Sequence, residues 1–506
     1  MANPLYDTLF GQHSHKTSVF LMLPDGTQIT HDAFLKQAAQ MAHAIAHAGL
    51  KPGDRVAAQV EKSPQALALY AACVQGGFIF LPLNTAYTAD ELRYFLENSG
   101  ATLVVCDGRL HDQIAAMAAP LQAQVHTLNA DGSGSLPQAA QAQPDVYPTA
   151  QRTADDLAAF LYTSGTTGRS KGAMLTQGNL LSNAKTLMSY WRFDEEDVLL
   201  HALPIFHTHG LFVASNVMLL AGGKMIFLPK FDVADMLRAL PQATTMMGVP
   251  TFYTRLLAEP KFTKDVVAHM RLFVSGSAPL LAETHKAFEE RTGYRILERY
   301  GMTETNMNTS NPYDGARRAG TVGLPLPDVE VKITDPATGR SLATGEIGQI
   351  EVRGPNVFKG YWQMPEKTKA ELRSDGFFIT GDLGKIDDQG YVHIVGRNKD
   401  LIISGGYNIY PKEIELVLDE QAGVLESAVI GVPHPDFGET VLAVIVPYVG
   451  QEVDVAAIER AVSAVLARFK LPRKYVVLDA LPRNTMGKVQ KNILRDQYQT
   501  SFTADQ

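Results

Sequence analysis

The chain has 506 residues, of which 45% are hydrophobic and 19% are charged, and its formal net charge is −8. This is an ordinary globular composition, and the length allows two or more domains with substantial cores. The acidic balance argues against nucleic acid as the principal partner.

Cysteine usage and the first residues of the chain bear on its compartment. Cys73 and Cys106 lie inside apolar stretches without the spacing of a metal site, so we expect buried thiols in a reducing compartment. Residues 1–20 lack the basic start and the apolar core of a signal peptide, and no apolar run reaches the ~18 residues that a membrane span needs. These features predict a cytoplasmic protein with no membrane partner.

Helical and strand patterns alternate along the first part of the chain. Helical periodicity is expected at 34–48 and 63–75, a capping box of Thr88 and Glu91 precedes another helix, and strands are expected at 55–60, 78–83 and 101–106. This alternation predicts right-handed crossovers, a parallel sheet with helices on both faces, and therefore the α/β class. Residues 129–154, rich in Ala, Gln, Gly and Pro, predict a surface excursion.

The stretch YTSGTTGRSKG at 162–172 follows an apolar run at 157–162 that predicts a strand leading into a loop. Glycines let backbone N–H groups turn toward an anion, and Lys171 adds a positive charge, so the stretch predicts a phosphate-holding loop. A flexible linker is the alternative, although linkers seldom follow an apolar strand. A Walker A loop requires Gly before the lysine and Ser or Thr after it, whereas here Ser170 precedes Lys171 and Gly172 follows it.

After a predicted helix at 180–190 and a strand at 198–203, the stretch PIFHTHG at 204–210 contains two histidines. Their i, i+2 spacing, with no acid or cysteine nearby, does not make a complete metal site. We expect His207 to border a cleft at the end of the strand and to order substrate or phosphate. A packed, hydrogen-bonded histidine is the alternative.

Two later strands also end in small or polar residues. The run at 270–275 leads to Ser277, where a flat ring could lie against the backbone, and the stretch RILERYGMTE at 295–304 ends in polar groups. Tyr300 could flank an adenine, and Glu304 could hold Mg²⁺ because hard cations choose carboxylates. Taken alone, a glutamate in such a position is more often a surface acid or a helix cap.

The pattern changes in the last third of the chain. Short runs separated by Gly, Pro and Asp turns predict a small β-rich subdomain at about 321–397. Beyond Lys399 a compact αβ unit follows, so we expect an N-terminal domain at 1–397, a hinge at 398–400 and a C-terminal domain at 401–506. The short runs lie at 329–333, 348–354, 377–380 and 391–395; helices are expected at 411–418 and 456–467, and strands at 427–431 and 441–447.

Two polar residues in the last third of the chain, Asp382 and Lys488, are candidates for a functional site. Asp382, in the TGD stretch, would suit a pair of ribose hydroxyls, with a plain turn aspartate as the alternative. Lys488 lies in the stretch LPRNTMGKVQK, for which a solvated basic face is the alternative.

Five motifs in order, YTSGTTGRSKG, RYGMTE, TGD, GRNKD and PRNTMGKVQK, resemble the adenylate-forming superfamily of acyl-CoA synthetases, luciferases and peptide-synthetase adenylation domains. The resemblance covers nearly the whole chain. It implies a large N-terminal domain of parallel-rich sheets, a small mobile α+β C-terminal domain, and chemistry at their interface that uses ATP, Mg²⁺ and coenzyme A.

The resemblance also implies roles for individual residues. Lys488 would reach the reacting carboxylate and the α-phosphate and offset the repulsion between these two anions. The other catalytic residues would be His207, Thr303 and Glu304, with Thr167 and Glu304 at the metal. The nucleotide would contact Thr163, Ser164, Gly165, Thr166, Thr167, Gly168 and Lys171 at its triphosphate, Ser277, Ala278, Pro279 and Tyr300 on its adenine side, and Asp382 and Arg397 at its ribose. The other implied nucleotide-binding residues are Glu298, Arg299, Gly301, Met302, Thr303, Lys399 and Lys488.

In relatives that make thioesters, the small domain swings about a hinge that matches Lys399 and carries Lys488 away. The loop SGGYN at 404–408 would then open a tunnel for the thiol of coenzyme A. The implied coenzyme A residues are Ser404, Gly405, Gly406, Tyr407 and His434. We add the basic residues Lys470, Arg473 and Lys474 as contacts for its phosphates, with a solvated surface as the alternative.

The expected substrate follows from Arg299, because an arginine in a buried cleft needs an anionic partner. A second carboxylate on the substrate could supply it through two parallel hydrogen bonds. In this respect the chain looks most like the malonyl-CoA synthetases of the superfamily, which implies malonate and also methylmalonate as substrates. The expected neighbours of the substrate are His207, Thr208, Arg255, Ser277, Arg299 and Met307. Alternatively Arg299 pairs with Glu298 or Glu304, although Glu298, adjacent in a strand, should face the opposite side.

Other functions stay open at this point. The acid could be another short, medium-chain or aromatic carboxylate, or the enzyme could load a carrier protein, although no carrier segment is seen in the sequence. A non-enzymatic nucleotide-binding protein would be expected to lack Lys488 or Glu304, and both are present. Lys488 is also chemically open to a lysine acetyltransferase, which would remove its charge. We expect a monomer or a weak homo-oligomer.

Overall fold

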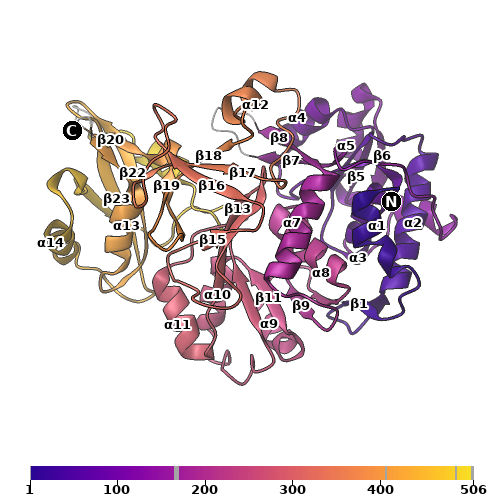
Figure 1. Cartoon of the computed structure of the whole chain (residues 1–506), viewed down its shortest axis with the longest axis horizontal. Coiled ribbons are helices and arrows are strands. Elements are labelled where there is room, and N and C mark those ends of the chain that lie inside the picture. Colours follow the sequence, from indigo (N-terminus) through magenta and orange to yellow (C-terminus); the bar gives the residue numbers. More distant parts are fainter. Residues whose placement is uncertain (1, 164–169, 405–406, 485–486, 503–506) are drawn as a thin grey trace. The chain divides into compact units, whose positions relative to one another are not determined.

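The computed structural model describes residues 2–163, 170–404, 407–484 and 487–502 (Figure 1). It divides into two compact units: unit 1 comprises residues 1–330 and 352–378, and unit 2 comprises residues 331–351 and 379–506. The predicted α/β class is confirmed, with parallel-rich sheets in the large N-terminal part and a smaller C-terminal part. The hinge at 398–400 stays a prediction; these residues form the short 3-10 helix η6 (Asn398–Asp400).

One sheet of unit 1 has six strands in the order β6-β5-β3-β4-β7-β8. All neighbours in it are parallel except β7 and β8, which form an antiparallel pair at one edge. Its strands are β3 (Arg55–Gln59), β4 (Ile79–Pro82), β5 (Leu103–Cys106), β6 (Gln124–Thr127), β7 (Leu157–Thr163) and β8 (Lys171–Thr176). The predicted strand before the glycine-rich loop is therefore confirmed as β7.

The second sheet of unit 1 has nine strands in the order β15-β14-β13-β12-β11-β9-β10-β1-β2. Its central strands are parallel, so their carboxyl ends meet at one edge, where ligands bind in open α/β sheets. Its strands are β1 (Val19–Met22), β2 (Gln28–Thr30), β9 (Val198–His201), β10 (Lys224–Phe227), β11 (Thr245–Gly248), β12 (Leu272–Ser275), β13 (Leu297–Met302), β14 (Asn306–Ser310) and β15 (Leu324–Pro325).

Local sequence explains where the helices of unit 1 begin and end. The capping box predicted from Thr88 and Glu91 is confirmed at α4, because each residue hydrogen-bonds the backbone N–H of the other. Residues 129–154 are not only a surface excursion, because they include α6, which buries Leu136 and Ala140. The helices are α1 (Pro4–Leu9), α2 (His31–His47), α3 (Pro64–Gly76), α4 (Ala89–Ser99), α5 (His111–Ala118), α6 (Ser135–Gln141), α7 (Gln177–Tyr190), α8 (Asn216–Ala221), α9 (Val233–Ala239), α10 (Pro250–Leu257), α11 (Ala282–Thr292) and α12 (Pro365–Glu371).

Unit 2 contains most of the predicted β-rich region and all of the chain beyond it. The four predicted short strands are confirmed and form one sheet: β16 (Glu330–Thr334), β17 (Gly348–Arg353), β18 (Phe378–Ile386) and β19 (Val392–Arg397). A second sheet contains β20 (Ile402–Ser404), β21 (Tyr407–Ile409), β22 (Val424–His434), β23 (Gly438–Pro447) and β24 (Lys474–Val477), together with α13 (Pro411–Asp419), α14 (Val455–Val465) and α15 (Lys491–Tyr498). Apolar clusters lie on both faces of the β22–β23 pair and form the core of this unit.

No helix within the described ranges combines the length and the apolar character needed to cross a bilayer.

We expect His31 to make the stability of the protein dependent on pH. It is the first residue of α2, and its ring centre lies 4.7 Å from those of His13 and Phe20. Burial, with a smaller contribution from His13, lowers the pKa of His31 to about 4, below its usual 6.5. Between pH 6.5 and about 4, His31 is therefore protonated in the unfolded chain but neutral in the folded chain. The free energy of unfolding should fall as the pH drops through this range, because the unfolded state binds more protons.

We expect His31→Asn to reduce this pH dependence, by up to about 1.4 kcal/mol per pH unit between pH 6.5 and 4. Urea unfolding of wild type and variant across this range measures it. Equal pH slopes for the two proteins would show that His31 does not titrate between the folded and unfolded states.

Candidate active site

The two ends of the predicted phosphate loop are held side by side at the edge of a sheet. Thr163 ends β7, Lys171 begins β8, and the two residues are paired in the antiparallel ladder. The backbone of 359–362 runs along the outer edge of β8, with a hydrogen bond from Trp362 N to Gly172 O of 2.8 Å. The predicted loop residues between these ends, Ser164, Gly165, Thr166, Thr167 and Gly168, lie outside the described residues.

Lys171 is held by side chains from the segment 359–371. Its Nζ lies 3.3 Å from Oε2 of Glu371, the last residue of α12, and 4.2 Å from the centre of the Tyr361 ring. A second lysine, Lys367, pairs with the other oxygen of Glu371 at 2.6 Å. Burial by itself raises the pKa of Glu371, but Lys367, Tyr361 and Lys171 outweigh it, so the pKa is lowered and the carboxylate is ionised at neutral pH.

Glu304 lies beside this cluster. The hydroxyl of Tyr361 is 3.0 Å from Oε1 of Glu304 and 2.7 Å from Oε2 of Glu371, and Oγ1 of Thr163 is 3.5 Å from Oε1 of Glu304. Burial raises the pKa of Glu304, and the Tyr361 hydrogen bond and the charge of Lys171 partly oppose that rise. The structure therefore brings together three predicted residues, Thr163, Lys171 and Glu304, and adds Tyr361 and Glu371, which we had not predicted.

The donor set around Glu304 fits a magnesium ion that a phosphate accompanies. Proteins hold Mg²⁺ through one or two carboxylates together with phosphate oxygens and water. In the described part of the chain no group of three or more His, Cys, Asp or Glu is placed to hold a metal by itself. A cation at Glu304 would therefore take its remaining ligands from a bound phosphate and from water.

Arg299 lies in β13, at the carboxyl edge of the nine-stranded sheet, and is only 3% exposed. Its Nε and Nη2 atoms are buried and have no hydrogen-bond partner among the described residues. Burial lowers the pKa of Arg299 to about 9, with Tyr253 and Glu298 opposing the shift, so the guanidinium is still charged at neutral pH. A pairing with Glu298 or Glu304, the alternative considered from the sequence, would have satisfied these atoms, so the observed geometry favours an external anion.

Small residues and a histidine surround the Arg299 guanidinium. A Cβ added at Gly276 would lie 2.4 Å from Cζ of Arg299, so only a glycine at this position avoids a clash with the Arg299 guanidinium. His209 hydrogen-bonds Oγ of Ser277 through Nδ1 at 3.2 Å, and its backbone N–H donates to Nδ1 of His207 at 3.2 Å. Burial, then the charge of Arg299, lowers the pKa of His209 well below its usual range, so its ring is neutral.

Two backbone features mark the same place. Ser277 has a φ of 72°, a left-handed conformation that is unusual for a residue other than glycine and is concentrated at functional sites. His209 begins the π-helix η4 (His209–Ser215), a form also found mostly at functional sites. Sequence reasoning favoured His207 and did not select His209; the available signal was the position of both histidines in the PIFHTHG stretch directly after a strand.

The other predicted residues of unit 1 fall into two groups. Thr208, Glu298 and Met307 are buried, and Oε1 of Glu298 lies 3.3 Å from the backbone N of Leu280. Five others are half-buried: Ala278, Tyr300, Gly301, Met302 and Thr303. A Cβ at Gly301 would lie 2.6 Å from Cε of Met307, so these two residues are close neighbours. Pro279 and Arg255 are exposed, and the guanidinium of Arg255 lies 5.9 Å from the Phe231 ring centre, so the structure gives no support for Arg255 as a neighbour of Arg299.

In unit 2, Asp382 and Arg397 face each other across β18 and β19, with Nε of Arg397 3.1 Å from Oδ1 of Asp382. Lys399 lies two residues further on, in η6. Two hydrogen bonds of 3.0 Å tie Lys488 to Asn484: the backbone N–H of Lys488 donates to Oδ1 of Asn484, and the backbone N–H of Asn484 donates to the carbonyl oxygen of Lys488. Gly487, just before Lys488, has a φ of 74°. These two hydrogen bonds therefore fix where the Lys488 backbone lies within unit 2.

The predicted coenzyme A residues of unit 2 gather around the β20–β21 hairpin. Ser404 pairs with Tyr407 and with Gly438, which in turn pairs with His434. The Tyr407 ring is 57% exposed and stacks on Phe469 at 4.7 Å. The three predicted basic residues also have partners. The Arg473 guanidinium lies over the Phe437 ring, Lys470 pairs with Glu413, and Lys474 donates to the hydroxyl of Ser501. Gly405 and Gly406 lie outside the described residues.

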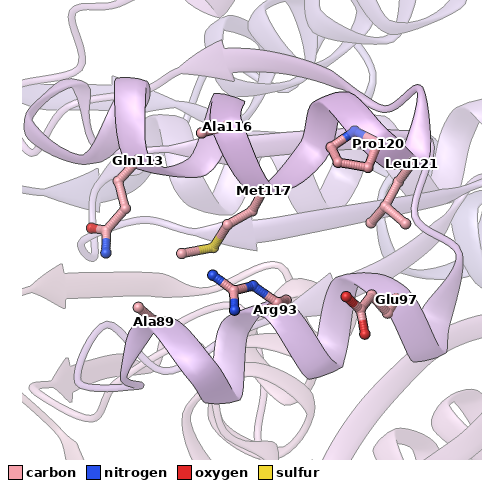
Figure 2. A pocket seen from close by; sticks show the side chains of 8 residues that line it. All are labelled: Ala89, Arg93, Glu97, Gln113, Ala116, Met117, Pro120 and Leu121. Atoms are coloured by element: carbon pink, nitrogen blue, oxygen red, sulfur yellow. The ribbon is translucent and has the colours of Figure 1, made fainter.

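A cavity of about 330 Å³ lies elsewhere in unit 1, between α4 and α5 (Figure 2). Arg93 and Glu97 of α4 face Gln113 and Met117 of α5 across it. None of the residues proposed from the sequence lines this cavity, so it is separate from the Arg299 and Lys171 clusters.

Comparisons with known proteins agree with the motifs. A family model described as "AMP-binding enzyme" matches residues 10–362, and a second, "AMP-binding enzyme C-terminal domain", matches residues 413–488. The chain belongs to the AMP-binding enzyme family. Lys171, Glu304 and Arg299 of this AMP-binding enzyme lie within the first match, whereas Glu371 lies beyond its end, and Lys488 ends the second match.

Relatives of this AMP-binding enzyme are similar over almost its whole length. A feruloyl-CoA synthase of an Amycolatopsis species is 36% identical over 477 residues, covering 94% of each chain. A malonate–CoA ligase of Arabidopsis thaliana is 35% identical over 480 residues, covering 88% of this chain and 78% of that protein. The crystal structure of ATP-bound MatB from Rhodopseudomonas palustris is 57% identical, with a TM-score of 0.97 and coverage of 99% of this chain and 100% of that one.

Proposed function

We propose that the protein is an AMP-forming acid–CoA ligase whose substrate is malonate, with methylmalonate as a second substrate. In the first step a malonate carboxylate attacks the α-phosphorus of ATP, which forms malonyl-AMP and releases pyrophosphate. In the second step the thiol of coenzyme A attacks the acyl carbon, which forms malonyl-CoA and releases AMP.

The observation that carries the choice of acid is Arg299. The charged Arg299 is 3% exposed, and two of its guanidinium nitrogen atoms have no hydrogen-bond partner within the described ranges, which favours an anion supplied by the substrate. The carboxylate of malonate that does not react is such an anion, and arginine can hold it through two parallel hydrogen bonds. A monocarboxylate of any length would leave these buried donors unsatisfied. The similarity to the malonate–CoA ligase and to the ATP-bound MatB structure supports the same acid.

The remaining roles follow from charge and position. Lys171 and the loop before it would hold the triphosphate, and Glu304 would hold Mg²⁺, which when bound neutralises developing charge on the phosphate oxygens. Neutral His209 keeps Ser277 in place beside Arg299, and His207 and Thr208 lie next to it in the chain. Asp382 and Arg397 would contact the ribose, and Lys488 would offset the repulsion between the carboxylate and the α-phosphate.

Three further parts belong to the proposal. Rotation about Lys399 would exchange Lys488 for the Ser404–Tyr407 hairpin at the site, with His434, Lys470, Arg473 and Lys474 near coenzyme A. The protein is proposed to act in the cytoplasm as a monomer or a weak homo-oligomer. Acetylation of Lys488 by a lysine acetyltransferase would remove its charge and stop adenylation.

The test is AMP release that depends on ATP and coenzyme A, measured with acetate, butyrate, benzoate, ferulate, malonate, methylmalonate and succinate. We expect the kcat/KM for malonate to exceed that for acetate or butyrate by at least about 100-fold, because a site built for a polar group rejects analogues that lack it. Succinate should be about 10-fold or more below malonate, because its extra methylene misplaces the second carboxylate.

The other outcomes identify a different enzyme. A preference for benzoate or ferulate would make the protein an aromatic acid–CoA ligase and would leave Arg299 without its proposed role. AMP formation without dependence on coenzyme A would point to an adenylation enzyme that uses another acceptor.

A further inference from the structure

The pairing of Lys171 with Glu371 raises a question that the proposed function does not answer. If Lys171 binds the triphosphate, its charge needs a partner whenever the nucleotide is absent, because an unpaired buried ammonium is costly. Lys171 is 7% exposed as a residue. Glu371, which is 200 residues further along the chain, supplies the anion at 3.3 Å.

The position of Glu371 is built by several independent contacts. Residues 359–362 are fixed against β8 by backbone hydrogen bonds, including 3.0 Å from Met174 N to Gly360 O. Tyr361, which is 2% exposed, carries Lys171 over its ring and donates its hydroxyl toward Glu371. The backbone N–H of Tyr361 donates to Oγ1 of Thr368, in the middle of α12, at 2.9 Å and so ties this helix to the segment before it. Figure 1 labels α12. All of these residues belong to unit 1.

Lys367 shows why Glu371 can release Lys171. It pairs with Oε1 of Glu371 at 2.6 Å, while Lys171 approaches Oε2. When phosphate oxygens take over Lys171, the carboxylate therefore keeps Lys367 and Tyr361 as partners and is not left alone. A phosphate that enters meets one negative charge already in place beside the lysine, and this charge opposes its binding.

We propose that Glu371 is a positioning residue that acts as an internal anion: it holds Lys171 in the empty site, is exchanged for the phosphates of the nucleotide, and weakens the binding of pyrophosphate. This rests on the proposed function, in which pyrophosphate is the leaving group of the first step. The consequence is faster release of pyrophosphate, with Lys171 kept in place between turnovers.

The variant Glu371→Gln keeps the size of the side chain and its acceptor for Tyr361 but removes the charge. We expect it to bind Mg²⁺-pyrophosphate about 5- to 10-fold more tightly than wild type, measured by calorimetry, and to be inhibited correspondingly more strongly by pyrophosphate. Glu371→Asp, which keeps the charge, should remain closer to wild type. The matched control is Glu366→Gln, an exposed glutamate of the same helix, which changes the net charge equally and should have no effect.

A double-mutant cycle with Lys171→Ala separates a direct role from a general one. If Glu371 acts through Lys171, Glu371→Gln should no longer change pyrophosphate affinity in the Lys171→Ala background. An unchanged or weakened affinity in Glu371→Gln, or an equal effect of Glu366→Gln, would overturn the proposal. A wild-type protein that binds neither ATP nor pyrophosphate would instead refute the proposed function, so the two failures are distinguishable.

Discussion

Replacing Arg299 with alanine is expected to lower kcat/KM for malonate by at least about 30-fold, while activity with acetate or butyrate changes little. Truncating one partner of a buried, hydrogen-bonded charge pair costs about 2–5 kcal/mol, and the lower end corresponds to about 30-fold. Acetate and butyrate have no second carboxylate, so they do not use the Arg299 guanidinium. A loss of activity with malonate that spares acetate and butyrate is expected only if Arg299 contacts the substrate.

The stability of this variant provides a second readout. Two guanidinium nitrogen atoms of Arg299 have no hydrogen-bond partner among the described residues, so truncating the side chain leaves no acceptor of these two atoms unsatisfied there. Thermal unfolding should therefore show a much smaller loss than is usual for a buried arginine with a partner. Arg295→Ala, an exposed arginine that pairs with Glu289, is the matched control and should leave the selectivity unchanged. An equal loss of activity with every acid would mean that Arg299 is structural and that malonate is the wrong substrate.

Replacing Lys488 with alanine is expected to lower the rate of adenylation by about 100- to 1000-fold, the effect of removing one donor that stabilises a developing anion. The second step should change much less, because in the proposed rotation Lys488 has left the site by then. Pyrophosphate exchange into ATP measures the first step, and release of AMP from chemically prepared malonyl-AMP with coenzyme A measures the second.

The variant Lys488→Gln imitates acetylation by removing the charge and keeping a polar side chain, so it should be as impaired in the first step as Lys488→Ala. Arg468→Ala, which removes an exposed positive charge from the same unit, is the control and should keep both steps. Loss of both steps to the same extent in Lys488→Ala would contradict the proposed division of roles.

Much of the fold could be predicted because local patterns report local structure. The strand before the glycine-rich loop, the capping box at Thr88 and the four short strands of 329–395 all follow from hydrophobic period and turn residues. The helix α6 was missed because its alanine- and glutamine-rich sequence has little periodicity, and its burial of Leu136 and Ala140 depends on packing.

The sequence selected some residues of the candidate site and missed others. Lys171 and Glu304 belong to short motifs whose residue types already express their chemistry, so the sequence alone selected them. Glu371 and Tyr361 lie in a stretch with no such signature, and the exposed Arg255 resembled a substrate ligand only as long as its surroundings were unknown. His209 is neutral because of its burial and of Arg299, and neither property can be read from neighbouring residues.

The sequence by itself determined the family, the α/β class and the residue types at the proposed phosphate, metal and acid sites, because these depend on motifs within a few consecutive residues. Only the tertiary structure decided that two guanidinium nitrogen atoms of Arg299 have no hydrogen-bond partner among the described residues, and that Lys171 pairs with Glu371. Both are properties of burial and of contacts between segments far apart in the chain: the cost of a buried charge depends on which groups the fold brings within a few ångströms of it.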